Sequence, residues 1–103
     1  MPKVAVAKNG DIAPGSVRVV DAAGKRIALC NHDGTFYAID DVCTHDRGPL
    51  DQGELIGWEI ECPRHGARFD VRTGQATRLP AIMPVKTYPV TADGDQISVE
   101  VPE

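Results

Sequence analysis

Short runs of alternating hydrophobic and polar residues follow one another along most of this chain, and turn residues separate them. Residues 17–20 alternate, residues 21–24 read Asp-Ala-Ala-Gly, and residues 26–31 return, which is the pattern of a β-hairpin. Further turns are expected at residues 33–34 and 92–95. No stretch predicts a helix longer than one or two turns. The expected strands span residues 17–20, 26–31, 35–39, 55–61, 87–91 and 96–101.

Strands at this spacing predict an all-β fold, an antiparallel β-sandwich or a small barrel. Residues 40–73 break the pattern, since they contain several glycines and two prolines, and they predict a loop-rich insertion between β segments. A second irregular stretch, residues 79–84, contains prolines whose fixed φ angles stiffen the loop. The expected organisation is a single domain over residues 1–103, with a β-sandwich base formed by residues 1–39 and 74–103.

The composition argues against nucleic-acid and membrane partners and against a disulfide-stabilised fold. A chain of 103 residues fits one compact domain, and a formal net charge of −4 argues against nucleic acid, because phosphate binding requires clustered positive charge. No apolar run reaches the roughly 18 residues of a membrane span, and residues 1–10 lack the pattern of a signal peptide. Three cysteines, an odd number, do not form a disulfide framework. We therefore expect a cytoplasmic protein with neither a nucleic-acid nor a membrane partner.

Two short segments of the insertion carry potential metal ligands. Residues 43–45 read Cys-Thr-His and residues 62–65 read Cys-Pro-Arg-His, with sixteen residues between the two segments. Each segment offers one thiolate and one imidazole in a tight turn. Two such turns give a site of two sulfur and two nitrogen ligands, which suits Zn²⁺ or an iron–sulfur cluster. Gly48 and Gly66 follow the histidines, where a sharp turn and close approach to the metal favour glycine.

These segments resemble the paired Cys-x-His and Cys-x-x-His-Gly motifs of the Rieske iron–sulfur proteins. The resemblance covers nearly the whole chain: residues 40–73 are similar to the cluster-binding subdomain of that family, residues 79–84 to its proline loop, and the rest to its antiparallel β-sandwich. It implies one [2Fe–2S] cluster whose inner iron is held by the two cysteines and whose outer iron, near the surface, is held by the two histidines. The implied ligands are Cys43, His45, Cys62 and His65.

The residues around the implied cluster indicate a low-potential branch of the family. In the respiratory and photosynthetic Rieske proteins each cluster loop carries an extra cysteine, and the two form a disulfide; the matching positions here are Gly48 and Arg64. That branch also has a serine and a tyrosine whose hydroxyls bond to sulfur, where this chain has Ala67 and Phe69. Fewer donors to sulfur destabilise the reduced cluster, so we expect a potential of roughly −150 mV. The residues expected around the cluster are Gly48, Arg64, Gly66, Ala67, Phe69 and Pro80.

This branch resembles the ferredoxin components of bacterial multicomponent oxygenases. The resemblance implies a monomer that carries single electrons from an NAD(P)H-dependent flavoprotein reductase to a terminal ring-hydroxylating oxygenase, with no substrate turnover of its own. The chain has no G-x-G-x-x-G dinucleotide motif. Two alternatives stay open: the small Rieske subunit of a nitrite reductase-like enzyme, and a zinc-binding interaction module.

Other residues have structural interpretations. Cys30 lies in an expected strand and should be a buried, inert thiol. His32 precedes a turn and should be solvated, whereas Trp58 should lie in the core or on a sheet face. Ile82 and Met83 should either shield the cluster from water or anchor their loop. Five arginines are expected either to pair with nearby acids or to take part in docking: Arg47, Arg64, Arg68, Arg72 and Arg78.

Overall fold

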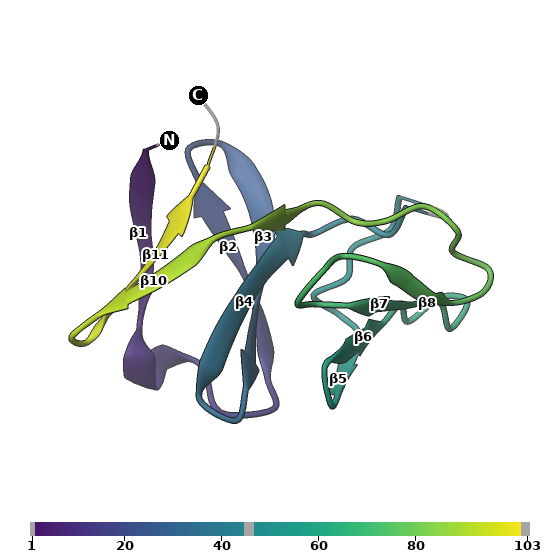
Figure 1. Ribbon diagram of the computed structural model, residues 1–103, viewed down its shortest axis with the longest axis horizontal. Helices are drawn as coiled ribbons and strands as arrows, with labels where there is room; N and C mark the ends of the chain where they lie inside the picture. The colour runs from purple at the N-terminus through teal and green to yellow at the C-terminus, as the bar shows by residue number, and fades with distance from the viewer. Residues whose placement is uncertain (1, 45–46, 102–103) are drawn as a thin grey trace.

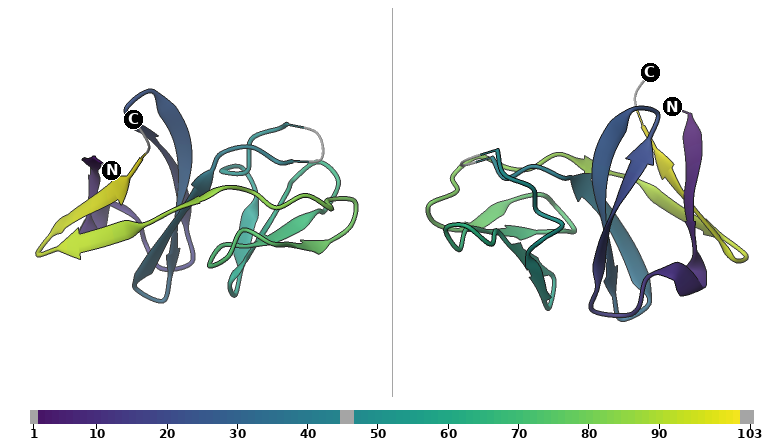
Figure 2. Two further views of the ribbon diagram at one scale, coloured as in Figure 1. Left: turned by 45° about the horizontal axis from the view of Figure 1, so that its top comes forward. Right: turned by 180° about the vertical axis from the view of Figure 1, so that it is seen from behind.

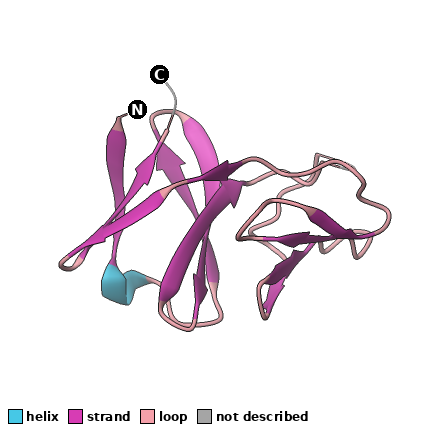
Figure 3. Cartoon of the chain, in the orientation of Figure 1, coloured by secondary structure: helices cyan, strands magenta, loops and turns pink. Residues whose placement is uncertain are grey.

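The computed structural model describes residues 2–44 and 47–101. Within them nearly all regular structure is antiparallel β-strand, with one short 3-10 helix, η1 (Asn9–Asp11) (Figure 3), and no helix is long and apolar enough to cross a membrane. The predicted all-β fold class is confirmed. The strands are β1 (Lys3–Lys8), β2 (Val17–Ala22), β3 (Lys25–His32), β4 (Thr35–Asp40), β5 (Glu54–Ile56), β6 (Glu59–Glu61), β7 (Arg68–Asp70), β8 (Ala76–Arg78), β9 (Thr87–Tyr88), β10 (Val90–Asp93) and β11 (Gln96–Glu100).

Three sheets divide the molecule into two parts (Figure 1). The sheet β1-β11-β10 and the sheet β2-β3-β4-β9 form a base, whereas the sheet β5-β6-β7-β8 lies to one side of it among long loops, on the right of Figure 1. We call this second part the side part. We expected the loop-rich region to close at residue 73, but its sheet continues through β8 to Arg78 because β8 pairs with β7.

The two hairpins of the base have the turns that the sequence predicts. Ala23 and Gly24 connect β2 to β3 with φ angles of 54° and 84°, and Asp33 and Gly34 connect β3 to β4 with φ angles of 51° and 91°. Two successive positive φ angles are those of a type I′ turn, whose twist matches that of the flanking strands. A glycine at the second position fits this requirement in both turns.

The expected single strand at residues 55–61 is instead a hairpin. β5 and β6 pair with each other, with Leu55 opposite Ile60, and the turn between them contains Gly57 (φ 61°) and Trp58. The alternation of hydrophobic and polar residues continues across this short turn, which is why the sequence pattern did not reveal it. β1, β7 and β8 were also not predicted.

Residues 87–91, expected as one strand, are divided at Pro89. β9 pairs with β4, whereas β10 pairs with β11, so the chain passes from one base sheet to the other at the proline. Proline has no N–H to donate to a strand partner, and a break in pairing there costs no hydrogen bond. The hairpin of β10 and β11, with its turn at residues 94–95, agrees with the prediction.

The sheet β2-β3-β4-β9 packs against other residues on both of its faces. Alternate residues of β3 point to opposite faces of the sheet and enter different hydrophobic clusters. Ile27 and Leu29 pack with the residues between the two base sheets. Ala28 and Cys30 pack instead with residues of the side part. Cys30 is fully buried, as expected, and burial raises the pKa of its thiol to about 12. The base therefore shares a hydrophobic core with the side part, and this core fixes one against the other.

A surface contact adds to this shared core. The ring of His32, at the end of β3, lies 4.2 Å from the ring of Trp58 in the side part, and the Arg72 guanidinium lies 4.4 Å from the centre of the Trp58 ring. Arg72 also donates two hydrogen bonds to Asp70, which hold the pKa of that carboxyl below its usual value. Trp58 is 41% exposed, so of its two expected positions the core is wrong, and its ring lies against His32 at the end of β3; His32 is therefore half-buried and not solvated as expected.

The chain enters and leaves the side part through neighbouring strands. Ile39 of β4 lies opposite Thr87 of β9, and the Asp40 N–H donates to the Lys86 carbonyl at 2.9 Å. The Tyr88 hydroxyl donates to the Asp40 carboxylate, and burial raises the pKa of this tyrosine. The two connections are therefore joined to each other where the side part begins.

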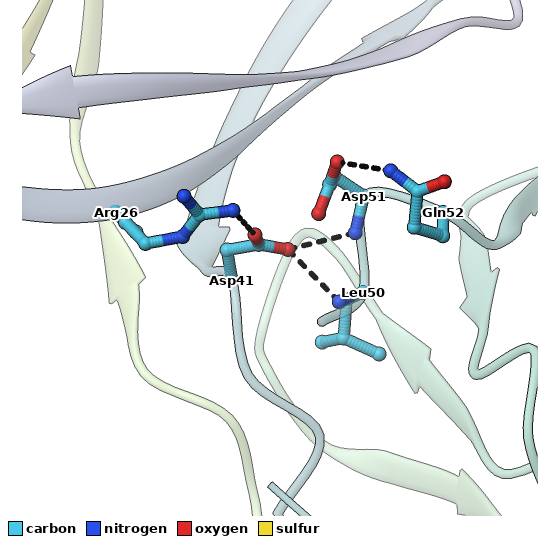
Figure 4. A network of polar contacts seen from close by, with 5 residues as sticks. All are labelled: Arg26, Asp41, Leu50, Asp51 and Gln52. Carbon is cyan, nitrogen blue, oxygen red and sulfur yellow. Dashed lines mark hydrogen bonds and ion pairs between the residues drawn. The ribbon is translucent and has the colours of Figure 1, made fainter. Parts of the chain in front are cut away.

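Asp41, directly after β4, fixes the first connection (Figure 4). Its side chain is fully buried. One carboxylate oxygen accepts hydrogen bonds from the Leu50 N–H at 2.8 Å and the Asp51 N–H at 2.7 Å, and the other accepts from the Arg26 guanidinium at 3.2 Å. One carboxylate therefore joins β3 of the base to the chain on both sides of residues 42–49.

Burial raises the pKa of Asp41, and the neighbouring Asp51 carboxylate adds to the increase, whereas the Asp51 N–H and Arg26 oppose it. A carboxyl whose pKa is higher in the folded state stabilises the fold in its protonated form, and this contribution is lost as pH rises through the folded value. Ionised Asp41 is thus the less favourable form, even though it accepts three hydrogen bonds.

Substitutions of Asp41 should separate its acceptor role from its charge. Asp41→Ala removes the acceptor, and each N–H left buried should cost about 1–3 kcal/mol of unfolding free energy. Asp41→Asn keeps an acceptor and should cost less. Relative to the wild type, Asp41→Asn should gain stability as pH rises above about 4, where an unfolded aspartate ionises, because only the carboxyl titrates.

Urea unfolding between acidic and neutral pH measures both effects, with Asp93→Asn, at an exposed residue of β10, as a control for the loss of one charge. Equal losses for the two Asp41 variants would show that the acceptor is unimportant, and a pH-independent difference between Asp41→Asn and the wild type would contradict the raised pKa.

Candidate metal centre

The first candidate loop begins at Cys43, two residues after Asp41. The Cys43 N–H donates to the Gly48 carbonyl at 2.7 Å, and the Arg47 N–H donates to the Cys43 carbonyl at 2.7 Å. These two bonds close the segment 43–48 into a compact loop. His45, one of the four expected ligands, lies outside the described residues.

The second candidate loop connects β6 to β7 and repeats this pattern. The Cys62 N–H donates to the Ala67 carbonyl at 2.7 Å, and the Gly66 N–H donates to the Cys62 carbonyl at 3.1 Å. Cys43 and Cys62 thus occupy equivalent first positions, although the chain after them differs: the expected histidine is the third residue of one loop and the fourth of the other.

Both loops require a left-handed residue at their fifth position. Gly66 has a φ angle of 76° and Arg47 a φ angle of 63°. A glycine was expected to make the sharp turn in each loop, and Gly66 does so. In the first loop the residue with this conformation is Arg47, which directly precedes Gly48. Gly48 is buried, and its carbonyl accepts the bond that closes the loop.

The described ligand candidates lie at different depths. Cys43 is 0% exposed and Cys62 is 1% exposed, and both belong to the core shared by the base and the side part. His65 is exposed. The two loops therefore present thiols on the inside and an imidazole at the surface.

Residues 79–84 lie against the first loop and are held at their C-terminal end. The Thr44 hydroxyl donates to the Met83 carbonyl at 2.7 Å, and the Val85 N–H donates to the Gly74 carbonyl at 2.8 Å. A Cβ atom at Gly74 would lie only 2.1 Å from the Val85 carbonyl oxygen, so this close approach requires glycine. A cavity of about 330 Å³ remains between this segment and the first loop, lined by Val42, Cys43, Thr44, Arg47, Met83 and Pro84.

Buried neighbours, not the large side chains, anchor this segment. Ala81 and Val85 are each 3% exposed, whereas Ile82 is 78% and Met83 62% exposed. The expectation that Ile82 and Met83 anchor their loop was therefore wrong, and the alternative, that they shield the cluster from water, stays a prediction. Pro80 is partly buried beside Ala81.

The other residues expected around the cluster separate into an inner and an outer group. Ala67 and Phe69 are 0% exposed and pack in the same core as Cys43 and Cys62. Arg64 is exposed on the second loop. Neither inner side chain carries a hydroxyl that could donate to sulfur, and the low potential expected from their absence stays a prediction.

Arg68 and Arg72 form surface ion pairs with acids that were expected as partners. Arg68 lies 3.0 Å from Glu61 and 3.6 Å from Glu59, and Arg72 pairs with Asp70. Such pairs at the surface contribute little to stability.

Two polar residues of the site were missed from the sequence. Asp41 and Thr44 hold the first loop at its base and its top, respectively, but each makes its decisive contact with a residue that is distant in the chain or has no distinctive type. No local pattern marks such contacts, so no signal in a single sequence would have revealed them.

The donor set and its placement fit an iron–sulfur cluster. Two loops of identical hydrogen-bond pattern each offer a buried thiol, and a surface imidazole follows the second thiol. Thiolates within an apolar interior and imidazoles at the surface suit a cluster whose two irons have different ligands and different exposure.

Comparison with known proteins agrees with this geometry. Residues 2–89 match the family described as Rieske [2Fe-2S] domain. The chain belongs to the Rieske family. It therefore carries a Rieske-type [2Fe–2S] cluster, and this decides against the zinc-binding alternative.

Relatives of this Rieske protein are ferredoxins of dioxygenase systems. The chain is 40% identical over 100 residues to the ferredoxin component of the p-cumate 2,3-dioxygenase system of Pseudomonas putida, covering 95% of this chain and 85% of the relative. The solved ferredoxin of carbazole 1,9a-dioxygenase from Nocardioides aromaticivorans is 39% identical, with a TM-score of 0.92 over 96% of this chain and 97% of that one.

A further solved structure holds such a ferredoxin together with its oxygenase. It is the complex of reduced oxygenase and oxidised ferredoxin in carbazole 1,9a-dioxygenase, and it matches at 34% identity with a TM-score of 0.90, over 94% of this chain and all of that one. A nitrite reductase small subunit from Mycobacterium tuberculosis has a TM-score of 0.88 over 99% of this chain and 97% of that one, but is only 20% identical and shares the fold alone.

Hydroxyls introduced beside the buried cysteines should raise the reduction potential of this Rieske protein. Ala67→Ser and Phe69→Tyr each place a donor in the core that contains Cys43 and Cys62, and a bond to sulfur stabilises the reduced, more negative cluster. We expect an increase on the order of 50 mV per effective hydroxyl, which is about 1 kcal/mol for a one-electron couple.

A redox titration measures this shift, with Phe69→Leu as a control that changes packing without adding a hydroxyl. If neither variant nor their combination raises the potential, the absence of hydroxyls at these positions does not explain a low potential.

Proposed function

We propose that this chain is a ferredoxin that carries single electrons from an NAD(P)H-dependent flavoprotein reductase to the terminal oxygenase of an aromatic-ring dioxygenase system. The observation that supports the proposal is the pair of equivalent loops, with buried cysteines and a surface histidine, in a chain similar over nearly its full length to ferredoxin components. The proposal assigns no substrate to the chain itself.

In this proposal Cys43, His45, Cys62 and His65 hold the cluster, with the cysteines on the inner iron and the histidines on the outer iron. When bound, the cluster supplies a centre that accepts and releases one electron. The chain buries the two cysteines among apolar side chains, which keeps water from them, and the Asp41 and Thr44 hydrogen bonds hold the first loop in place.

The electron enters and leaves at the exposed edge of the site. His65 is exposed there, and so are Leu79, Ile82 and Met83, at 73%, 78% and 62%. Large apolar side chains that gather on a surface commonly mark a contact with another protein. The figures show this end of the molecule pointing away from β1 and β11, with no strand of the base covering it (Figure 2).

Substitution of either cysteine should abolish cluster assembly. Cys43→Ser and Cys62→Ser are expected to yield colourless protein without the rhombic EPR signal of a reduced Rieske cluster, because serine replaces an essential thiolate. Iron and sulfide analysis accompanies the spectra, and Cys30→Ser, which changes a buried cysteine on β3, is the matched control. Unaltered spectra in a Cys43 or Cys62 variant would contradict the ligand assignment.

Electron relay tests the function directly. Holo-protein is added to a flavoprotein reductase, NADH and a terminal oxygenase from the p-cumate, naphthalene or carbazole system, and hydroxylated product is measured. We expect product formation to depend on this protein with at least one of the three oxygenases, and to be absent with Cys43→Ser. Reduction by the reductase without delivery to any of the three would contradict the proposed acceptor.

A further inference from the structure

Arg47 adopts a backbone conformation that disfavours any residue with a Cβ atom. Its φ angle is 63°, in the left-handed region, and the equivalent position of the second loop is occupied by Gly66 with a φ angle of 76°. The other left-handed non-glycine residues, Ala23 and Asp33, belong to hairpin turns that require this conformation. A glycine would satisfy the first loop at least as well, so the backbone does not explain the arginine.

The side chain of Arg47 lies at the edge of the candidate metal centre. It is exposed, and it lines the cavity of about 330 Å³ together with Cys43, Thr44 and Met83. The hydrogen bond from Thr44 to the Met83 carbonyl holds the two walls of this cavity together. Arg47 is thus fixed, by its loop, next to the route by which an electron must leave.

Arg47 brings to this exit a charge opposite to that of the whole chain. Among the described residues of the three segments 43–48, 62–67 and 79–84, the charged side chains apart from the histidine are Arg47 and Arg64, both exposed. The whole chain has a formal net charge of −4. Met83 lines the same cavity as Arg47, and the side chains of Met83 and of its neighbour Ile82 are exposed, so a guanidinium and apolar side chains are both accessible at this exit.

The acids of the neighbouring sheet have cationic partners of their own, because arginines of the same sheet pair with them. Glu59 and Glu61 lie within 3.6 Å and 3.0 Å of Arg68, and Asp70 pairs with Arg72. Asp46, which precedes Arg47 in the sequence, lies outside the described residues. The variant Asp46→Asn, described below, measures how its charge affects the exit.

We propose that Arg47 is a docking residue that pairs with a carboxylate on the terminal oxygenase, in a contact whose apolar part is formed by Ile82 and Met83. The docking surface of that partner then carries acids around an apolar centre. This inference rests on the proposed electron-transfer function and adds to it the chemistry of the partner surface and one residue that recognises it.

Small redox ions test the charge at the exit without any protein partner. Holo-protein reduced by one electron is mixed in a stopped-flow instrument with ferricyanide, which takes the electron and becomes ferrocyanide, or with cationic hexaamminecobalt(III). At low ionic strength Arg47→Gln should slow the reaction with ferricyanide about fivefold and speed the reaction with the cation, and Arg47→Glu should enlarge both effects. Both effects should disappear near 1 M salt, where charges are screened within about 3 Å.

Two variants control for net charge. Arg18→Gln removes the same charge from an exposed residue of β2 in the base and should leave both rates unchanged, whereas Asp46→Asn should change them in the sense opposite to Arg47→Gln. If the Arg47 variants react with both ions as the wild type does, Arg47 does not set the charge at the exit and the proposal is overturned.

Delivery to the oxygenase tests the docking itself. With the oxygenase that accepts electrons from the wild type, the rate should fall as salt rises, and this dependence should be weaker for Arg47→Gln and restored by Arg47→Lys. The docking role would be overturned if the wild type and the Arg47 variants delivered electrons at the same rate, or if the wild-type rate increased with salt. The electron-transfer function would stand in either case. Failure of the wild type to deliver electrons would instead count against the function, and the experiment with small ions still reports on Arg47.

Arg47→Gly separates docking from folding. Because glycine fits the left-handed position, this variant should keep or raise the melting temperature, by about 2–4 °C, while it slows delivery as Arg47→Gln does. The EPR spectrum should stay that of the wild type, and the reduction potential should match that of Arg47→Gln, which removes the same charge. A lower melting temperature with unchanged delivery would show that Arg47 has a structural role only.

Discussion

The buried carboxylate of Asp41 is the interaction on which the geometry of the site depends. The described residues of the first ligand loop belong to no strand or helix, so strand pairing does not hold them. Asp41 instead accepts hydrogen bonds from the chain beyond the loop and from Arg26 of the base, which fixes both ends of the segment at one point. Its raised pKa shows that this arrangement is maintained against the cost of burying a charge. The hydrogen bonds of Asp41 thus position the loop independently of any bond between its ligands and iron.

The rest of the site follows from packing. β3 sends alternate side chains into two different cores, so the base sheet that faces β1, β10 and β11 also supports the two cysteines from the other side. The second loop needs no equivalent of Asp41, because β6 and β7 pair directly on either side of it. Two loops with the same internal hydrogen bonds are therefore supported by different means, one by a buried carboxylate and one by a sheet.

The sequence predicted what depends on local chemistry. The hairpins with Gly24 and Gly34 and the strands around them were predicted, because turn residues have characteristic types and spacings, and the spacing of the cysteines and histidines indicated the Rieske family. The hairpin at Trp58 and the change of sheet at Pro89 were not, because a short turn can continue an alternating pattern and one residue can end a pairing. The equivalence of Arg47 and Gly66 was also invisible, since it appears only in hydrogen bonds and φ angles.

The pairing of β4 with β9 has a consequence for how such proteins can change. The side part leaves the base after one strand and returns through its neighbour, so its two ends are adjacent and joined by hydrogen bonds. A segment with adjacent ends can be lengthened, shortened or exchanged without altering the register of the strands that carry it. The side part is therefore an insertion between two adjacent strands of the base. The whole metal-binding unit can be exchanged as one piece between proteins that have the same base.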